Sequence, residues 1–251
     1  MKILKAIGAF FVRIGRWIKD TAWVQPLLIV GAIFAIIFSI PAITEWIEGL
    51  AEDAASSEKY YQKYQRSLEG GETSEADKLI ADIADGDAKS SIGEKFYLVF
   101  VNEECSACAE AKNGFEALEK KWTGSLAPNS DDLPFKIVSI FTDEETEQTT
   151  SRESAFAQFL DRNGEFFVEA ALIGKNSYYH LNGNSSESDL EVLESVDPET
   201  FLTPTILLID FSEDYGGVSE VMFGVPGETD IQKAELLRDC WDHANDFEGT
   251  E

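Results

Sequence analysis

Residues 95–108 read KFYLVFVNEECSAC, and residues 109–122 continue with AEAKNGFEALEKKW. The first string holds six consecutive apolar or aromatic residues, 96–101, a pattern typical of a strand that is buried on both faces. The second string repeats apolar side chains at spacings of three and four, which predicts an amphipathic helix. The residues with this spacing are Cys108, Ala111, Phe115, Leu118 and Trp122. The sequence therefore predicts a strand, a short turn and a helix, with both cysteines where the strand passes into the helix.

The position of Cys105 and Cys108 relative to this helix has a chemical consequence. Cys105 lies near the expected helix N-terminus, where unpaired backbone N–H groups and the helix dipole favour an anion. A thiolate forms more easily there than in solvent. Two thiols held two residues apart can close a small disulfide ring and open it again, so this pair is the candidate redox centre.

Length, charge and cysteine content bound the class of protein. A chain of 251 residues, less a membrane segment, has room for one sizeable soluble domain. Three cysteines are too few for a disulfide framework. The formal net charge of −27 excludes nucleic acid as a partner of the soluble part, because that part repels phosphates. The acidic composition is typical of a solubilising surface, and a preference for basic partners is the alternative.

The N-terminal region predicts a membrane anchor. Residues 1–20 have the pattern of a cationic amphipathic helix suited to the headgroup layer of an anionic leaflet. Residues 21–44 contain no charged side chain over 24 positions, which is long enough to span a bilayer, and Trp23 and Trp46 flank them. A cleaved signal peptide is the alternative, but its apolar core would be shorter and would end at a small-residue cleavage site. We therefore expect one retained transmembrane helix, with lipid contacting residues 1–46.

The distribution of charge predicts how this anchor is oriented. Residues 1–20 carry five Lys/Arg against Asp20, a local charge of +4, which leaves −31 on the rest of the chain. The bias in Lys and Arg predicts a cytoplasmic N-terminus and an extracytoplasmic C-terminal domain.

Residues 45–90 are expected to form a helical connector. Residues 45–68 are compatible with a polar helix that bears Tyr60, Tyr61 and Tyr64 on one stripe, which either packs on the domain or lies near the membrane. After a break at Gly70-Gly71, Ser74 and Asp77 are spaced as a helix cap followed three residues later by an acidic residue.

A second buried strand is predicted at residues 135–141, after the cysteine-bearing helix. A strand, a helix and a strand in this order predict a right-handed unit with parallel strands. Residues 151–200 are expected to be an insertion that contains helices at 155–160 and 190–196 and an ambiguous apolar run at 166–173.

The C-terminal part predicts a hairpin and a helix. Thr203-Pro204-Thr205 opens an apolar run that ends at Phe211, and a proline belongs at the start or edge of a strand because it cannot donate to the ladder. Gly216-Gly217 marks a turn before the second hairpin strand at 218–224. An amphipathic helix is expected from 228 to about 245.

The order strand, CxxC, helix, strand, insertion, Thr-Pro strand, hairpin and helix resembles the thioredoxin superfamily over residues 92–246. The resemblance implies an α/β fold with a central mixed sheet and flanking helices, formed by residues 91–251 with the insertion at about 151–200. In that family the peptide bond before the equivalent proline is cis, and its loop lies against the active-site disulfide. The resemblance assigns Cys105 and Cys108 as catalytic, Thr203 and Pro204 as substrate-binding through backbone hydrogen bonds, and neither cofactor nor metal.

Three departures from the family pattern bear on the direction of electron flow. Many cytosolic members have a tryptophan before the first cysteine, where this chain has Glu104, and a buried aspartate at the position of Val99. Ser-Ala separates the two cysteines in place of Gly-Pro or Pro-His. Glu103 and Glu104 oppose a thiolate at Cys105, so the disulfide should be comparatively stable, which favours a reductase or isomerase over a strong oxidant.

A structural disulfide or half of a zinc site is the alternative interpretation of the CxxC. A zinc site needs two further ligands, and the other soft candidates are Cys240, His180 and His243. We expect Cys240 to be an inert buried residue of the last helix and assign no role to either histidine.

These expectations combine into one functional prediction, with one alternative. The chain resembles membrane-anchored thiol–disulfide oxidoreductases of Gram-positive-type cell surfaces, whose partners are extracytoplasmic protein thiols and disulfides. Cys105 would attack and Cys108 would resolve the mixed disulfide. The alternative is a non-catalytic adaptor that keeps the fold as a peptide-binding surface within a membrane complex.

Overall fold

Strand β1, Lys95–Val101, lies between two neighbours in the mixed sheet of the computed structural model, which describes residues 57–70, 73–123, 135–145, 154–180 and 187–243. The sheet order is β2-β1-β4-β5-β3, with β2 at Ile137–Phe141, β4 at Thr205–Asp210, β5 at Gly217–Phe223 and β3 at Tyr178–His180. β1 pairs in parallel with β2 and antiparallel with β4, and β4 pairs antiparallel with β5. The predicted strands and hairpin are therefore confirmed as parts of a mixed α/β fold.

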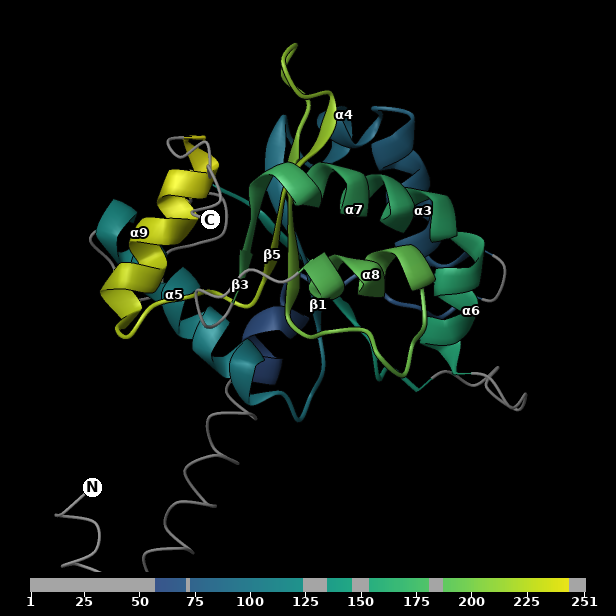
Figure 1. Ribbon diagram of the computed structural model, residues 1–251, viewed down its shortest axis with the longest axis horizontal. Coiled ribbons are helices and arrows are strands. Elements are labelled where there is room, and N and C mark those ends of the chain that lie inside the picture. Colours follow the sequence, from purple (N-terminus) through teal and green to yellow (C-terminus); the bar gives the residue numbers. More distant parts are fainter. Residues whose placement is uncertain (1–56, 71–72, 124–134, 146–153, 181–186, 244–251) are drawn as a thin grey trace, which may run out of the picture. The chain divides into compact units, whose positions relative to one another are not determined.

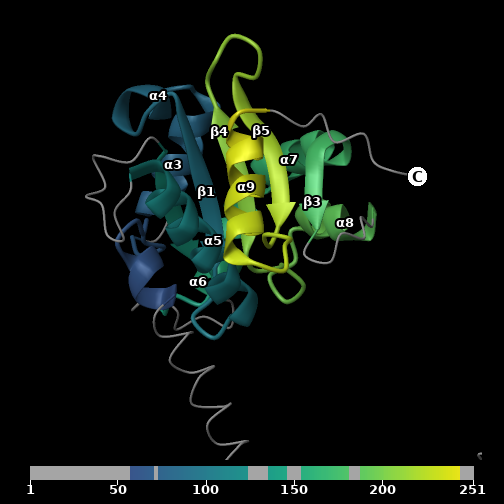
Figure 2. The same ribbon diagram turned by 90° about the vertical axis from the view of Figure 1, so that its left-hand side faces the viewer.

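Helices cover both faces of this sheet, as the two ribbon views show (Figures 1 and 2). One face carries α5, Ser106–Thr123, and α9, Asp230–Trp241. The other carries five helices: α3 at Glu75–Ala84, α4 at Ala88–Ser91, α6 at Ala155–Arg162, α7 at Gly164–Ser177 and α8 at Glu187–Ser195. The result is three layers, with the CxxC helix and the C-terminal helix together in one of them.

The uninterrupted apolar run of β1 is needed because both faces of the strand are covered. Phe96, Leu98 and Phe100 belong to the core beneath the five-helix layer, and Tyr97 and Val99 belong to the core beneath α5 and α9. All five side chains have 0% exposure. Helices α5 and α9 approach each other closely over the second core, since a Cβ on Gly114 of α5 would lie only 2.9 Å from Lys233 Cβ of α9.

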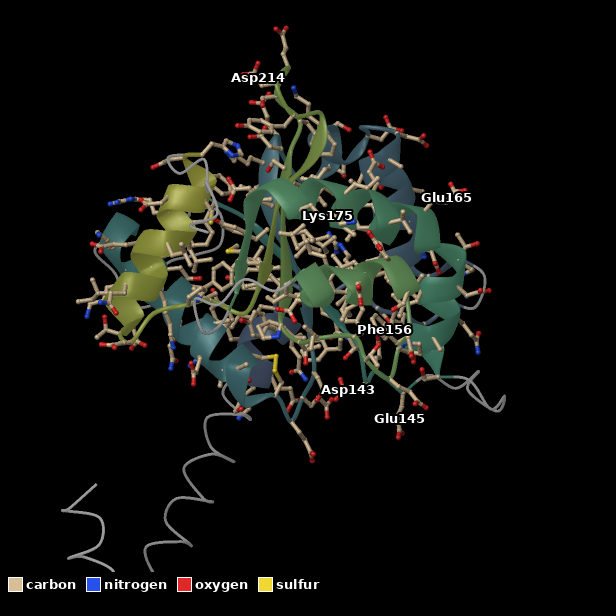
Figure 3. All side chains as sticks on the ribbon, viewed as in Figure 1. Asp143, Glu145, Phe156, Glu165, Lys175 and Asp214 are labelled. Carbon is tan, nitrogen blue, oxygen red and sulfur yellow. A yellow bond between two sulfur atoms is a disulfide. The ribbon has the colours of Figure 1, made fainter. Side chains whose placement is uncertain are left out.

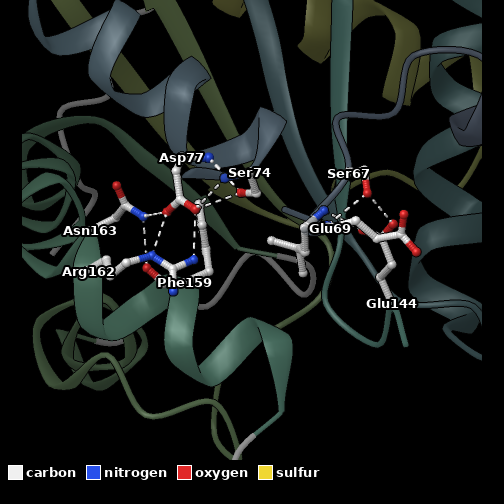
Figure 4. Close-up of polar contacts among 9 residues, drawn as sticks. Ser67, Glu69, Ser74, Asp77, Glu144, Phe159, Arg162 and Asn163 are labelled. Atoms are coloured by element: carbon white, nitrogen blue, oxygen red, sulfur yellow. Dashed lines mark hydrogen bonds and ion pairs between the residues drawn. The ribbon is translucent and has the colours of Figure 1, made fainter. Parts of the chain in front are cut away.

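The connector, as far as it is described, packs on the sheet. Residues 57–62 are helical, and Gln65 then forms a parallel bridge with Ser139 on the outer edge of β2. Tyr60 and Tyr61 are buried in the core beneath α5 and α9, so the tyrosine stripe packs on the domain. The Glu144 carboxylate accepts hydrogen bonds from the Ser67 hydroxyl and the Leu68 backbone N–H (Figure 4).

The insertion forms much of the five-helix layer and adds an edge strand. Helices α6 and α8 lie where two helices are expected, and the ambiguous run at 166–173 is the interior of α7. The run has no clear helical period in its hydropathy because two of its apolar residues, Val168 and Leu172, are exposed. The helix packs closely on α8, since a Cβ on Gly174 would lie 2.6 Å from a Leu190 side-chain atom. Strand β3, which the sequence analysis does not predict, pairs in parallel with β5.

The cap predicted at Ser74 is present and also links two helices. The Ser74 hydroxyl accepts from the Asp77 backbone N–H at 3.0 Å, and the Asp77 carboxylate accepts from the Ser74 N–H at 3.1 Å. The same carboxylate accepts from Arg162 Nε at 3.0 Å and from Asn163 Nδ2 at 2.8 Å, both at the end of α6 (Figure 4). Asp77 therefore holds α3 and α6 together.

Replacing Asp77 with alanine should lower the free energy of unfolding by about 2 kcal/mol, because it removes a helix cap and leaves Arg162 without its carboxylate. Burial alone would raise the pKa of Asp77, but hydrogen bonds from Arg162, Ser74 and Asn163 lower it below the ordinary value. The stabilisation is therefore present above the unfolded pKa of about 4 and is lost as the pH falls through the lower folded value. Urea unfolding at pH 7 and pH 3 measures both effects. Asp82→Ala, in the last turn of the same helix, should change stability by less than about 0.5 kcal/mol, and an equal loss in the two variants would contradict the link.

No helix in the part of the chain that the structure describes is long and apolar enough to cross a membrane. The amphipathic helix predicted at 1–20 and the anchor predicted at 21–44 lie outside the described residues. The same is true of the loop at 124–134 and of the end of the last predicted helix.

Candidate functional site

Cys105 and Cys108 form a disulfide at the junction between β1 and α5, where the sequence places them (Figure 3). The buried run of β1 ends at Val101, and α5 begins at Ser106. The Cys105 carbonyl accepts from the backbone N–H groups of Cys108 and Ala109 at 3.1 and 3.2 Å. Cys105 is therefore the residue that starts the helix, and Cys108 lies in its first turn.

The two sulfurs differ in their access to solvent. Cys105 is partly exposed, whereas Cys108 has 0% exposure and belongs to the core beneath α5 and α9. The Cys108 backbone N–H lies 3.0 Å from Cys105 Sγ and donates to it. After reduction this N–H would stabilise a thiolate on Cys105. An attacking partner can reach Cys105 and not Cys108.

The loop of Thr203 and Pro204 lies against the exposed sulfur. Cys105 Sγ is 3.3 Å from the Thr203 carbonyl oxygen, and the Thr203–Pro204 peptide bond is cis. The Pro204 carbonyl accepts from the Gly224 N–H at 2.8 Å, and the Thr205 hydroxyl donates to the Leu202 carbonyl at 2.7 Å. The structure thus brings together all four residues that the sequence analysis selects, across nearly a hundred positions of chain.

Tyr61 is a neighbour of the buried cysteine that the sequence analysis does not assign to the site. Its hydroxyl donates to the Cys108 carbonyl at 3.2 Å, and the Ser139 hydroxyl of β2 donates to the Tyr61 carbonyl at 2.6 Å. Complete burial raises the pKa of Tyr61 far above its ordinary value, so the phenol stays protonated and remains a donor. The tyrosine stripe at 60–64 was the available signal, but its contact with Cys108 depends on tertiary packing.

Carboxylates surround the approach to Cys105 on one side. A hollow of about 540 Å³ is lined by Gln62, Gln65, Phe141, Glu103, Glu104, Asp143, Glu144 and Glu145. The Glu103 backbone N–H donates to the Asp143 carboxylate at 2.9 Å. Slight burial and the nearby carboxylates of Asp143, Glu58, Glu104 and Glu145 raise the pKa of Glu103. The two residues that precede Cys105 therefore lie in a hollow of negative potential.

The remaining soft side chains do not join the disulfide in a metal site. Cys240 is buried, with its sulfur 3.6 Å from Met222 Sδ. His243 lies between the carboxylates of Asp210 and Glu220, near Lys95 at the start of β1, which is the strand end opposite the CxxC. His180 lies in the edge strand β3. Within the described ranges, no group of three or more His, Cys, Asp and Glu is placed to hold a metal ion.

The arrangement of the two sulfurs is suited to disulfide exchange. It offers one accessible sulfur, one shielded sulfur and a backbone carbonyl beside the accessible one. Val99, six residues before Cys105 in β1, is fully buried. Comparisons of the chain with models of known protein families, with curated proteins and with solved structures find no match.

Proposed function

We propose that this chain is a membrane-anchored thiol–disulfide oxidoreductase of the thioredoxin-like superfamily that acts on extracytoplasmic proteins. One observation carries the proposal: the sulfur of the partly exposed Cys105 lies 3.3 Å from the carbonyl of Thr203, in the loop that contains cis-Pro204. An extended segment of a substrate placed along this loop would have its own sulfur next to Cys105. The anchor and the extracytoplasmic location rest on the charge and hydropathy pattern of residues 1–46.

The topology of the sheet supports the same assignment. A parallel β1–α5–β2 unit is followed by the antiparallel β4–β5 hairpin and by α9, which packs beside α5. The bridge between Gln65 and Ser139 extends the sheet beyond β2 with a segment that precedes the CxxC in sequence. This arrangement agrees with the resemblance drawn from the sequence, in which the insertion between the two halves is additional material.

In the proposed reduction, both cysteines start as thiols. Cys105 first loses its proton, and its thiolate attacks one sulfur of a substrate disulfide. The substrate S–S bond breaks, and the second substrate sulfur leaves as a thiolate that takes up a proton. Cys108 then loses its proton and attacks Cys105 Sγ, which releases the first substrate sulfur as a thiol. The substrate has gained two electrons and two protons, and the protein now has the Cys105–Cys108 disulfide. A membrane dithiol donor would return the pair to its reduced state.

Electrostatics around Cys105 support a reducing or isomerising role. Neighbouring carboxylates disfavour a second negative charge, so Glu103, Glu104 and Asp143 oppose the Cys105 thiolate. The helix N-terminus and the Cys108 N–H act in the opposite direction. A less stabilised thiolate makes the disulfide form relatively more stable, which corresponds to a more negative reduction potential than that of a strong oxidant.

Replacing Cys108 with serine should trap substrates, because the mixed disulfide at Cys105 then has no resolving thiol. We expect the full-length Cys108→Ser variant, expressed in cells, to accumulate reductant-sensitive adducts at least tenfold over wild type on non-reducing gels. Cys105→Ser/Cys108→Ser is the matched control and should form none. If Cys108→Ser also forms none, the oxidoreductase proposal fails and the non-catalytic adaptor is the better interpretation.

A further inference from the structure

Most cationic side chains of the described residues are neutralised by carboxylates. Ion pairs engage Lys89, Lys95, Lys112, Lys121, Arg162, Lys175, Lys233 and Arg238. The lysines and arginines that form no ion pair with another described residue are Lys59, Lys63, Arg66, Lys78, Lys120 and Lys136. In a chain with 47 acidic and 20 basic residues, an unpaired cation needs an explanation.

Three of these unpaired cations line one cavity. Lys63, Arg66 and Lys136 surround a hollow of about 240 Å³ at the outer edge of β2, together with Ser91 and Tyr64. None of the described residues that line it is acidic, although acidic residues outnumber basic ones by more than two to one in the chain. Carboxylates approach two of these cations from outside the cavity, since the Lys63 charge acts on the Glu119 carboxylate and Lys136 also lines a second hollow with Glu94 and Asp210. Inside the cavity, the charged side chains of the lining are all cationic. The cavity is therefore a local region of positive potential.

The backbone of two different segments holds these cations in place. Arg66 donates its backbone N–H to the Ser139 carbonyl at 2.8 Å, and Ser139 donates its own N–H to the Tyr64 carbonyl at 3.0 Å. These two bonds fix the segment that bears Lys63 and Arg66 against β2. Lys136 Nζ donates to the Ile92 carbonyl, and Lys63 Nζ lies 5.7 Å from the centre of the Tyr60 ring. The segments that bear the three cations are thus held beside one cavity, and an anion bound there would reduce the repulsion among them.

We infer that this cavity binds a phosphate group. An arginine presents a planar fork of N–H donors that matches phosphate oxygens, and two lysines beside it add charge without fixed geometry. Three cations are better neutralised by a phosphate dianion than by a single carboxylate. Apolar lining from Ile92 and Ile137 lets the cavity also accept the organic part of a phosphate ester.

The phosphate cavity does not include the disulfide, although Gln65 lines both this cavity and the hollow that contains Glu103 and Glu104. Lys136 immediately precedes β2, whereas the CxxC follows the end of β1. Since β1 and β2 are parallel, the cavity and the disulfide lie toward opposite ends of the sheet. Binding of phosphate and disulfide exchange can therefore be tested and lost independently.

Calorimetric titration of the full chain in a neutral detergent with inorganic phosphate, at constant ionic strength in chloride, tests the inference. We expect saturable one-to-one binding that Arg66→Gln and Lys136→Gln each weaken at least tenfold. Lys120→Gln is the matched control, because it removes an unpaired exposed lysine from α5, and it should change the affinity less than twofold. Absence of saturable binding, or an equal effect of all three variants, would overturn the inference.

Two further measurements define the ligand. Acetate at the same ionic strength should bind at least tenfold more weakly than phosphate, and equal affinity would assign the cavity to carboxylates instead.

The source of the phosphate follows from titrating the chain in nanodiscs of phosphatidylcholine with and without one-third phosphatidylglycerol. A lipid headgroup in the cavity would lower the apparent affinity for inorganic phosphate in the anionic discs, whereas a soluble phosphate ester predicts the same affinity in both. Cys108→Ser should bind phosphate as wild type does.

Discussion

Replacing Phe100 with alanine should lower the free energy of unfolding by about 4 kcal/mol, one of the two largest effects that we expect in this protein. The Phe100 side chain has 0% exposure, and its ring centre lies 5.4 Å from that of Phe167 and 5.5 Å from that of Phe201. The rings of Phe156 and Phe159 lie 6.5 and 6.4 Å away. Truncation would therefore leave a cavity where β1 meets α6 and α7, and rigid neighbouring rings cannot easily fill it.

Urea unfolding of the wild-type and variant proteins measures this loss, provided that the dependence of stability on urea concentration stays the same. Phe211→Ala is the matched control, because Phe211 is only partly buried and its ring has one described ring neighbour, Phe96, at 6.3 Å. We expect it to cost about 1.5 kcal/mol. Equal losses in the two variants would mean that the phenylalanine cluster does not hold the insertion on the sheet.

Phe100 lies in a run whose structure the sequence predicts, whereas its neighbour Phe167 lies in a run whose structure the sequence leaves open. The run at 96–101 is interpreted as a strand because it is short and uninterrupted, is rich in β-branched and aromatic residues, and is followed by a turn. The run at 166–173 has no such unique interpretation, because a short apolar stretch suits a buried helix as well as a buried strand. The contacts of α7 with α8 and β5 decide the matter, and the exposed apolar residues Val168 and Leu172 obscure the helical period in the sequence. The edge strand β3 depends in the same way on its partner in β5.

Some residues of the candidate site could likewise be predicted from the sequence, and others could not. Cys105, Cys108, Thr203 and Pro204 could be selected because their residue types and spacing carry chemical meaning by themselves. The contact from Tyr61 to Cys108 could not, since a tyrosine stripe in a connector is compatible with several partners. The cavity lined by Lys63, Arg66 and Lys136 could not be predicted from the sequence for another reason. Its members are scattered among acidic residues, and only the pairing of 64–66 with β2 gathers them.

His243, to which the sequence analysis assigns no role, belongs to a network of buried charges at the far end of β1. Its Nε2 lies 2.8 Å from Asp210 Oδ2, and its Nδ1 lies 2.9 Å from Glu220 Oε1. Lys95 Nζ pairs with the same Asp210 oxygen at 2.9 Å, and the Tyr215 ring stacks on the imidazole with 4.0 Å between centres. Asp210 and Glu220 each have 5% side-chain exposure. The network joins β1, β4 and β5 to the residues that follow α9.

Replacing Asp210 with asparagine should lower the free energy of unfolding by about 3 kcal/mol at pH 7, because Lys95 and His243 lose the carboxylate between them. Burial alone would raise the pKa of Asp210, but hydrogen bonds from His243, from the Ser212 backbone N–H and from Lys95 hold it well below its usual range. A lowered folded pKa contributes stability above the unfolded value of about 4, and this contribution is lost as the pH falls. The difference between wild type and Asp210→Asn should therefore be constant from pH 5 to 7 and shrink below pH 4.

Glu220→Gln is the matched variant in the same network, and its effect should be small. A glutamine amide at position 220 can donate to His243 Nδ1 while His243 Nε2–H still donates to Asp210. Burial raises the pKa of Glu220, so its ionised form costs stability as the pH rises above the ordinary value, with a sign opposite to that of Asp210. We expect Glu220→Gln to change stability by less than about 1 kcal/mol at pH 7. Thermal unfolding from pH 3 to 8 compares the two variants, and a larger loss in Glu220→Gln than in Asp210→Asn would show that Glu220, and not Asp210, is the main anion of the network.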